Sequence, residues 1–271
     1  TDIEDVHDFP QLQGLAVHSG LIFQGQAAGN WQQSTAEGSL EITLDDLRGL
    51  PQPVSKILGL KPQISADIRF LDGESLGLDS LQISGREIDF QAQAQMGLSD
   101  QELAAEWILQ GPDLTTLDFA DLSGLFSATG QLDGTFQQLR TKIDIQVADL
   151  AGYQIRPSRF SGQISADLNT ASSGVDGKFL FDLHRGKERI TLSSNFAFAE
   201  QIFRLPDLGI QGPKTDISAH VELDTQQQHI DSELQMAIAQ VQALQSFLQI
   251  PVQGGLRLSA AVHGPMSQPY I

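Results

Sequence analysis

The chain has 271 residues, a 40% hydrophobic composition and a formal net charge of -18. This apolar content excludes a wholly disordered chain, while the low isoelectric point, near 4.4, and the lack of any Lys/Arg-rich run argue against nucleic acid as a partner. The absence of cysteine excludes disulfides, thiolate metal sites and cysteine nucleophiles, and it suits an oxidising compartment. No window approaches the roughly 18 consecutive apolar residues of a membrane span, and we expect the sequence to be a piece of a longer protein.

The first predicted element is a short helix over 54–60 (VSKILGL), and a second weak helical spacing occurs at 239–250 (AQVQALQSFLQI). Between and around them, apolar and polar residues alternate with a period of two, which is typical of strands with one dry and one wet face. In chain order, this pattern predicts strands at 63–70, 87–96, 142–147, 179–183, 190–198 and 217–223.

Gly, Asp, Asn and Ser clusters such as LDGES, LSDQE, NTASSGVDGK and GPKTD separate these strands and predict tight turns. Short connections favour antiparallel hairpins over parallel crossovers. The motif QISADI at 63–68 returns in similar form at 163–168, 216–221 and 257–262, which indicates a meander of similar strands. We therefore expect an all-β chain, a single continuous segment over 1–271 with a possible seam near 150–160.

The predicted apolar face has two explanations. Two sheets could press such faces together as a sandwich, or a single curved sheet could leave the face open as a trough for an apolar guest. Few large aromatic side chains and alternating alanines at 66, 92, 94, 219 and 260 favour the trough.

Signatures of catalysis are absent from the sequence. The six histidines show no metal-ligand spacing, although His220 and His229 could face each other across a hairpin. SSGVDGKFL lacks the spacing of a phosphate loop, and no GxSxG elbow occurs. We expect no enzyme, no metal and no cofactor.

Residues 106–168 resemble a repeat unit of the TamB family. They contain a tryptophan strand (EWILQG), a leucine-rich connector, a Gly-x-Leu-x-Gly-like strand (GQLDG), an alternating strand ending in Asp-Leu, and a Gly-Tyr-x-Ile strand. Similar segments occur at 242–271 and, more loosely, at 44–68. The resemblance covers most of the chain from about residue 12, although each motif is short.

The resemblance implies a long curved antiparallel sheet, a taco-like trough with a hydrophobic interior and one or two short helices. TamB-like proteins are anchored in the inner membrane of Gram-negative bacteria, cross the periplasm and are associated with phospholipid transport to the outer membrane. They are also associated with outer-membrane protein assembly, through a TamA-type barrel partner that meets a C-terminal region missing here. The family function rests on the apolar face, so the lipid-binding lining would comprise Ile64, Ile68, Phe70, Ile88, Phe90, Ile143, Ile145, Val147, Phe179, Phe181, Leu183, Phe196, Phe198, Ile217, Val221 and Leu223.

The leading hypothesis is a periplasmic lipid-conduit segment that binds phospholipid acyl chains in a hydrophobic groove. The alternative is a periplasmic scaffold or chaperone that offers sheet edges to outer-membrane or autotransporter proteins during translocation and assembly. A rigid adhesin or stalk ranks below both, because it predicts polar ladders on both faces.

Overall fold

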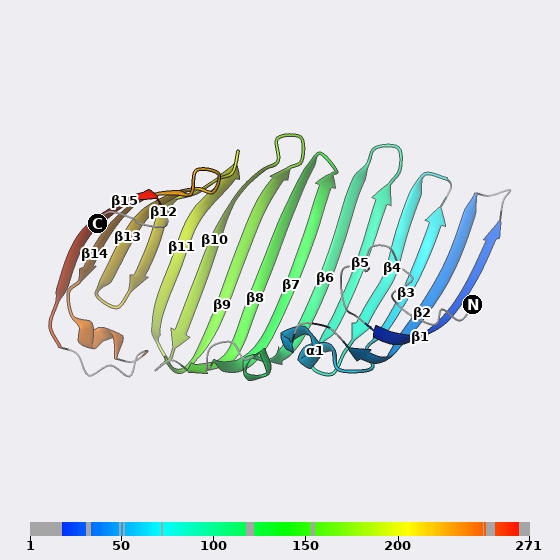
Figure 1. Cartoon of the computed structure of the whole chain (residues 1–271), viewed down its shortest axis with the longest axis horizontal. Coiled ribbons are helices and arrows are strands. Elements are labelled where there is room, and N and C mark those ends of the chain that lie inside the picture. The colour runs from blue at the N-terminus through cyan, green and yellow to red at the C-terminus, as the bar shows by residue number, and fades with distance from the viewer. Residues whose placement is uncertain are drawn as a thin grey trace. The chain divides into compact units, whose positions relative to one another are not determined.

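A computed structural model describes residues 18–30, 34–48, 50, 52–71, 73–117, 122–152, 155–245, 247 and 253–265. The chain divides into two compact units, Thr1–Phe136 and Gln137–Ile271. In each unit the strands lie side by side in chain order, and each described strand pair is antiparallel (Figure 1). The prediction of an all-β antiparallel chain is confirmed.

The first unit contains seven described strands and a short helix. The hairpins connect through short turns, except where α1 (Gln52–Leu58) and the 3₁₀ turn η3 (Leu114–Leu117) are inserted at the same end of the strands. The strands are β1 (His18–Asn30), β2 (Thr35–Arg48), β3 (Gln63–Leu71), β4 (Ser75–Ser84), β5 (Asp89–Gly97), β6 (Glu102–Asp113) and β7 (Ser123–Thr135).

The second unit contains eight described strands and the 3₁₀ turn η4 (Val241–Leu244), which lies in the last connection. The strands are β8 (Gln138–Gly152), β9 (Ile155–Asn169), β10 (Gly174–Arg185), β11 (Glu188–Ala199), β12 (Ile202–Gly212), β13 (Thr215–Asp224), β14 (His229–Ile238) and β15 (Leu256–Pro265). The described residues of the proposed seam at 150–160 lie in β8 and β9 of this unit, and the division of the chain into two units falls between Phe136 and Gln137.

The predicted short helices are located in connections between strands. α1 is followed by Gly59, which caps its C-terminus with a φ of +73° and an N–H that donates a hydrogen bond to the Ser55 carbonyl (2.9 Å). The carbonyls of Ile57 and Leu58 accept hydrogen bonds from the β4–β5 connection, so the helix is fixed against that turn. Within 239–250, the described residues form η4 rather than an α-helix.

The repeated motif and the predicted turns agree with the structure. All four copies of the QISADI-like sequence lie in strands, namely β3, β9, β13 and β15, and the four predicted turn clusters lie at hairpin ends. The suggested facing of two histidines is wrong, because the register sets His220 opposite Glu233 and His229 opposite Asp224.

Each unit is a single layer in its described residues. Extensive contacts between strands join only neighbours in the sheet, and the described fully buried residues are few. Phe247 and Pro62, the largest of them, lie in the β14–β15 and β2–β3 connections rather than between two sheets. Within a unit, the described strands therefore do not fold back as a sandwich.

Candidate functional site: an open apolar sheet face

The first unit has one continuous apolar face. Directly opposite residues in an antiparallel ladder share a face, so the register identifies it. Its paired positions in β2 to β7 hold only aliphatic, aromatic, alanine, glycine and methionine residues. Representative pairs are Ile42–Ile64, Ile64–Ile83, Ala66–Leu81, Ile83–Phe90, Phe90–Leu109 and Ala105–Leu132.

The second unit has a similar apolar face. The few polar side chains on it are mostly those of serine and threonine. Ser194, opposite Phe179, is buried, and its hydroxyl donates a hydrogen bond to the Asn195 carbonyl (2.6 Å), so it adds no free polar group. Representative apolar pairs are Ile143–Ile164, Phe160–Leu183, Phe181–Leu192, Ile210–Ile217, Leu223–Ile230 and Met236–Leu258.

Large aromatic rings on these faces lie over glycines of the neighbouring strand. Trp107 is opposite Gly130, and a Cβ added to that glycine would lie 2.1 Å from the indole Cε2. Phe181 covers Gly162 in the same way, with 2.4 Å from such a Cβ to its Cδ1. Because glycine has no side chain, the rings can lie close to the backbone of the neighbouring strand, and the layer of side chains on the apolar face is thin there.

The rings of the second unit form a contiguous cluster. The ring centroid of Phe181 lies 5.6 Å from that of Phe160 and 5.1 Å from that of Phe179, and Phe179 lies 6.5 Å from Phe196. Ring pairs at such distances stabilise one another by about 0.5–1.5 kcal/mol each. In the first unit, Phe90 and Trp107 form a similar pair at 6.2 Å.

Side chains on the apolar faces remain half-buried or exposed. Ile68 is 43% exposed, and Leu256 and Leu258 at the last described strand are 47% and 46% exposed. Among the described residues, the buried apolar members of the faces are three alanines, Ala66, Ala128 and Ala166, together with Val147 and Ile238. Lateral packing therefore stabilises the faces without covering them.

The structure places fifteen of the sixteen predicted lining residues on these faces. They divide between the units, with Ile64, Ile68, Phe70 and Phe90 in the first and the other eleven in the second. Ile88 lies outside the strands, in the β4–β5 connection, where its carbonyl accepts a hydrogen bond from the Gly85 N–H (2.8 Å).

The alternation in the sequence does not identify several residues of the apolar faces, because their strands break the period-two pattern. In β4, Leu78 and Leu81 are three residues apart, which would send them to opposite faces of a regular strand. A β-bulge at Asp79 and Ser80 restores both leucines to the apolar face. Pro206 and Asp207 do the same between Leu205 and Leu208 in β12.

The bulge aspartates anchor the neighbouring strand on the polar face. Asp79 accepts a hydrogen bond from Arg69 Nη2 (2.7 Å), and Asp207 accepts from the backbone N–H and Nδ2 of Asn195, both at 2.7 Å. In this chain, a bulge is therefore signalled by two apolar residues that are separated by two residues, one of which is an aspartate.

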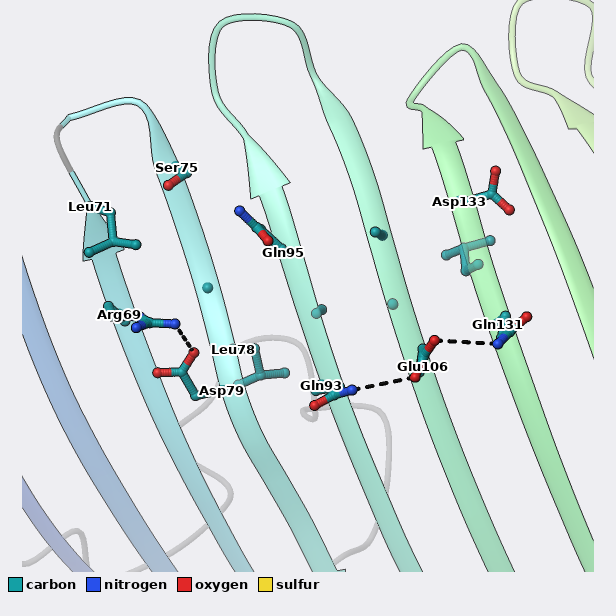
Figure 2. A pocket seen from close by; sticks show the side chains of 15 residues that line it. Arg69, Leu71, Ser75, Leu78, Asp79, Gln93, Gln95, Glu106, Gln131 and Asp133 are labelled. Atoms are coloured by element: carbon teal, nitrogen blue, oxygen red, sulfur yellow. Dashed lines mark hydrogen bonds and ion pairs between the residues drawn. The ribbon is translucent and has the colours of Figure 1, made fainter.

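Described hollows lie on the polar face rather than the apolar one. The largest, about 430 Å³, spans β3 to β7 in the first unit (Figure 2). Arg69 and Asp79 pair at one side, and Glu106 accepts hydrogen bonds from Gln93 (3.4 Å) and Gln131 (3.3 Å) at the other. Arg69 Nε is buried there without a hydrogen-bond partner.

Titratable groups with shifted pKa values belong to structural contacts. Hydrogen bonds from the backbone N–H groups of Thr115 and Gly124 lower the pKa of Asp113, which fixes the turn at η3. Burial works to raise the pKa of Asp182, but hydrogen bonds from Arg189 and Thr191 outweigh it and leave the pKa below its ordinary value. Among the described residues, no group of His, Asp or Glu is arranged to hold a metal ion.

Comparison of the chain with protein-family models, curated proteins and solved structures finds no match. In the described part of the chain, no helix has the length and apolar character needed to cross a membrane.

Proposed function

We propose that the chain is a lipid-conduit segment whose apolar faces hold phospholipid acyl chains while the headgroups stay in water. It would act in the periplasm, in a parent protein anchored in the inner membrane of a Gram-negative bacterium, and would carry phospholipid toward the outer membrane. The resemblance of residues 106–168 to TamB-like repeats supports this setting.

The observation that carries the proposal is a wide apolar face, continuous over neighbouring strands and uncovered by other described elements of its unit. Monomeric proteins rarely expose contiguous apolar surface on this scale, because its hydration is unfavourable. Half-exposed side chains such as Ile68 and Phe198 would lose that remaining hydration to an acyl chain.

No chemical step is required for transport along such a face. Moving an acyl chain through water would cost about 0.8 kcal/mol for each exposed methylene, whereas exchange between adjacent apolar contacts avoids most of that cost. Over Gly130 and Gly162, a guest chain would contact the aromatic rings of Trp107 and Phe181, of which only the indole N–H of Trp107 is a hydrogen-bonding group.

Site-specific photocrosslinking tests the proposal. A photoreactive amino acid at Phe179 or Phe196 should trap phospholipid from vesicles, because both side chains lie on the apolar face. The same probe at Leu180, which lies on the polar face of the same strand opposite Gln163, is the matched control. Equal trapping at Leu180 and Phe179, or no trapping at either, would refute the proposal for this segment.

A second candidate function is supported by β1. This strand pairs only with β2 among the described residues, and it contains no Asp, Glu, Lys, Arg or Pro, whereas every other described strand carries at least one charge. Natural edge strands are usually protected by charges or proline against pairing with other chains. An unprotected edge favours β-augmentation, as a scaffold for outer-membrane protein strands with a TamA-type partner would need.

Crosslinkers on the edge separate the two functions. A probe at Gln24 or Gln26 in β1 should trap an unfolded barrel protein if the scaffold function is right, and Gln26→Lys should abolish that trapping through a charge on the edge. Trapping of phospholipid at Phe179 without trapping of protein at β1 would favour the conduit alone.

A further inference from the structure

The second unit carries a concentration of cationic side chains at one end of its strands. Arg185, Lys187 and Arg189 lie within the β10–β11 hairpin end, and the register sets His184 between Arg159 of β9 and Arg189 of β11. We name these five residues, Arg159, His184, Arg185, Lys187 and Arg189, the basic end. The whole chain has a net charge of -18, so the basic end differs in charge from the rest of the chain.

The carboxylates within this hairpin end only partly neutralise it. Asp182 is bonded by Arg189 through two contacts, at 2.6 and 2.7 Å, and Glu188 lies opposite Arg185 in the ladder. No ion pair or hydrogen bond is described for the side chains of Arg159 and Lys187, and both residues are exposed. The basic end therefore retains unneutralised positive charge.

The turns at the opposite end of the same strands differ in composition. The turns at 170–173, 200–201 and 225–228 contain no lysine or arginine, and Glu200 lies in one of them. At the basic end, by contrast, the β12–β13 turn contains a further lysine, Lys214, whose Nζ donates a hydrogen bond to Gln240 Oε1. In the second unit, these turns at the basic end therefore carry more positive charge than the turns at the opposite end.

The basic end adjoins the aromatic cluster of the apolar face. Leu183, opposite Phe160 and Ile190, is the last apolar residue of β10 on that face, and Arg185 follows two residues later on the same side. Arg185 and Glu188 are the charged pair with which the apolar ladder of these two strands ends. Arg159 and Arg189 lie on the polar face, where both are opposite His184 in the ladder.

We infer that the basic end selects amphiphiles with a net anionic headgroup, held so that the acyl chains contact the aromatic cluster and the headgroup meets Arg185 and Lys187. This inference rests on the proposed function and adds headgroup selectivity to it. A zwitterionic headgroup gains less from the same end, because its own cation opposes the interaction. Each neutralised lysine or arginine should weaken capture of an anionic phospholipid about fivefold at low salt.

The test compares phosphatidylglycerol and phosphatidylcholine with identical acyl chains. The chain is incubated with vesicles of each lipid, separated from them and analysed by native mass spectrometry for bound lipid. Wild type should capture phosphatidylglycerol in preference, and Arg185→Gln with Lys187→Gln should lower that capture at least tenfold while leaving phosphatidylcholine capture unchanged. Arg189 is kept in this variant because its loss would remove the ion pair of the buried Asp182.

The charge-matched control is Arg140→Gln with Lys178→Gln, which removes two cations from the polar face toward the opposite end of β8 and β10. Equal capture of both lipids by wild type, or an equal loss of preference in the control, would overturn the headgroup inference and leave the conduit function standing. Capture of neither lipid would instead refute the conduit function, and the headgroup inference with it.

Discussion

Phe181→Asp tests whether the apolar face of the second unit is open to solvent. The ring is half-buried, lies over Gly162 and contacts two other phenylalanine rings. Truncation of a fully buried phenylalanine costs about 3–5 kcal/mol. With water on one side of the ring, about half of that cost applies, and the lost ring pairs add about 1 kcal/mol.

We therefore expect Phe181→Asp to lower the free energy of unfolding by about 3 kcal/mol and to abolish lipid capture by the second unit. The aspartate can turn to solvent on an open face, so it avoids the larger penalty of a buried, unpaired charge. Urea unfolding measured by circular dichroism gives the stability change, and native mass spectrometry after vesicle incubation gives the lipid capture.

Leu180→Asp is the matched control. Leu180 is the preceding residue of β10, is 41% exposed and lies on the polar face opposite Gln163 and Ser193. Its substitution should change stability by less than about 0.5 kcal/mol and leave lipid capture intact. Complete loss of the β signal in Phe181→Asp would show that the ring faces a dry interior. Lipid capture by Phe181→Asp at the level of the wild type would show that the apolar face is not the lipid site.

Three further predictions concern the glycine, carboxylate and bulge contacts. Gly130→Val should cost about 1–3 kcal/mol and shift the tryptophan fluorescence to the red, because the new side chain displaces the Trp107 ring. The pKa of Asp182 is lower in the folded chain than in the unfolded chain, so its ionised carboxylate stabilises the fold at any pH above the unfolded-state pKa of about 4. The free energy of unfolding should therefore fall as the pH drops below about 4 and the carboxylate is protonated. Asp182→Asn should flatten that part of the pH profile. Asp207→Ala should cost about 1 kcal/mol in urea unfolding, as the Asn195 N–H loses its acceptor, and Asp207→Asn should recover part of it.

The alternation in the sequence predicts a strand only while its phase is unbroken. QISADIRF and the run ending in QAQAQM coincide with β3 and β5, and their apolar residues lie on one face as expected. β4 and β12 are less evident in the sequence because Leu78–Leu81 and Leu205–Leu208 change phase. A bulge repairs that phase, and a bulge depends on the partner strand that it pairs with.

Glycine positions show a similar division. The sequence marks Gly130, Gly162 and Gly177 as breaks in otherwise alternating strands, where glycine is usually unfavourable. Only the register reveals that aromatic rings lie opposite each of them, Trp107, Phe181 and Phe196. Such a pair joins strands far enough apart in sequence that no local pattern identifies it.

By itself, the sequence determined that this chain forms antiparallel strands with one apolar and one polar side, because a period of two and the turn residues are local properties of the backbone. Only the tertiary structure decided what borders the apolar side. Whether another sheet covers such a face, and whether Arg159, Arg185 and Arg189 come together at one end of the strands, depends on strand register between segments separated along the chain. Register is fixed by the sum of many cross-strand contacts, and no single segment contains that information.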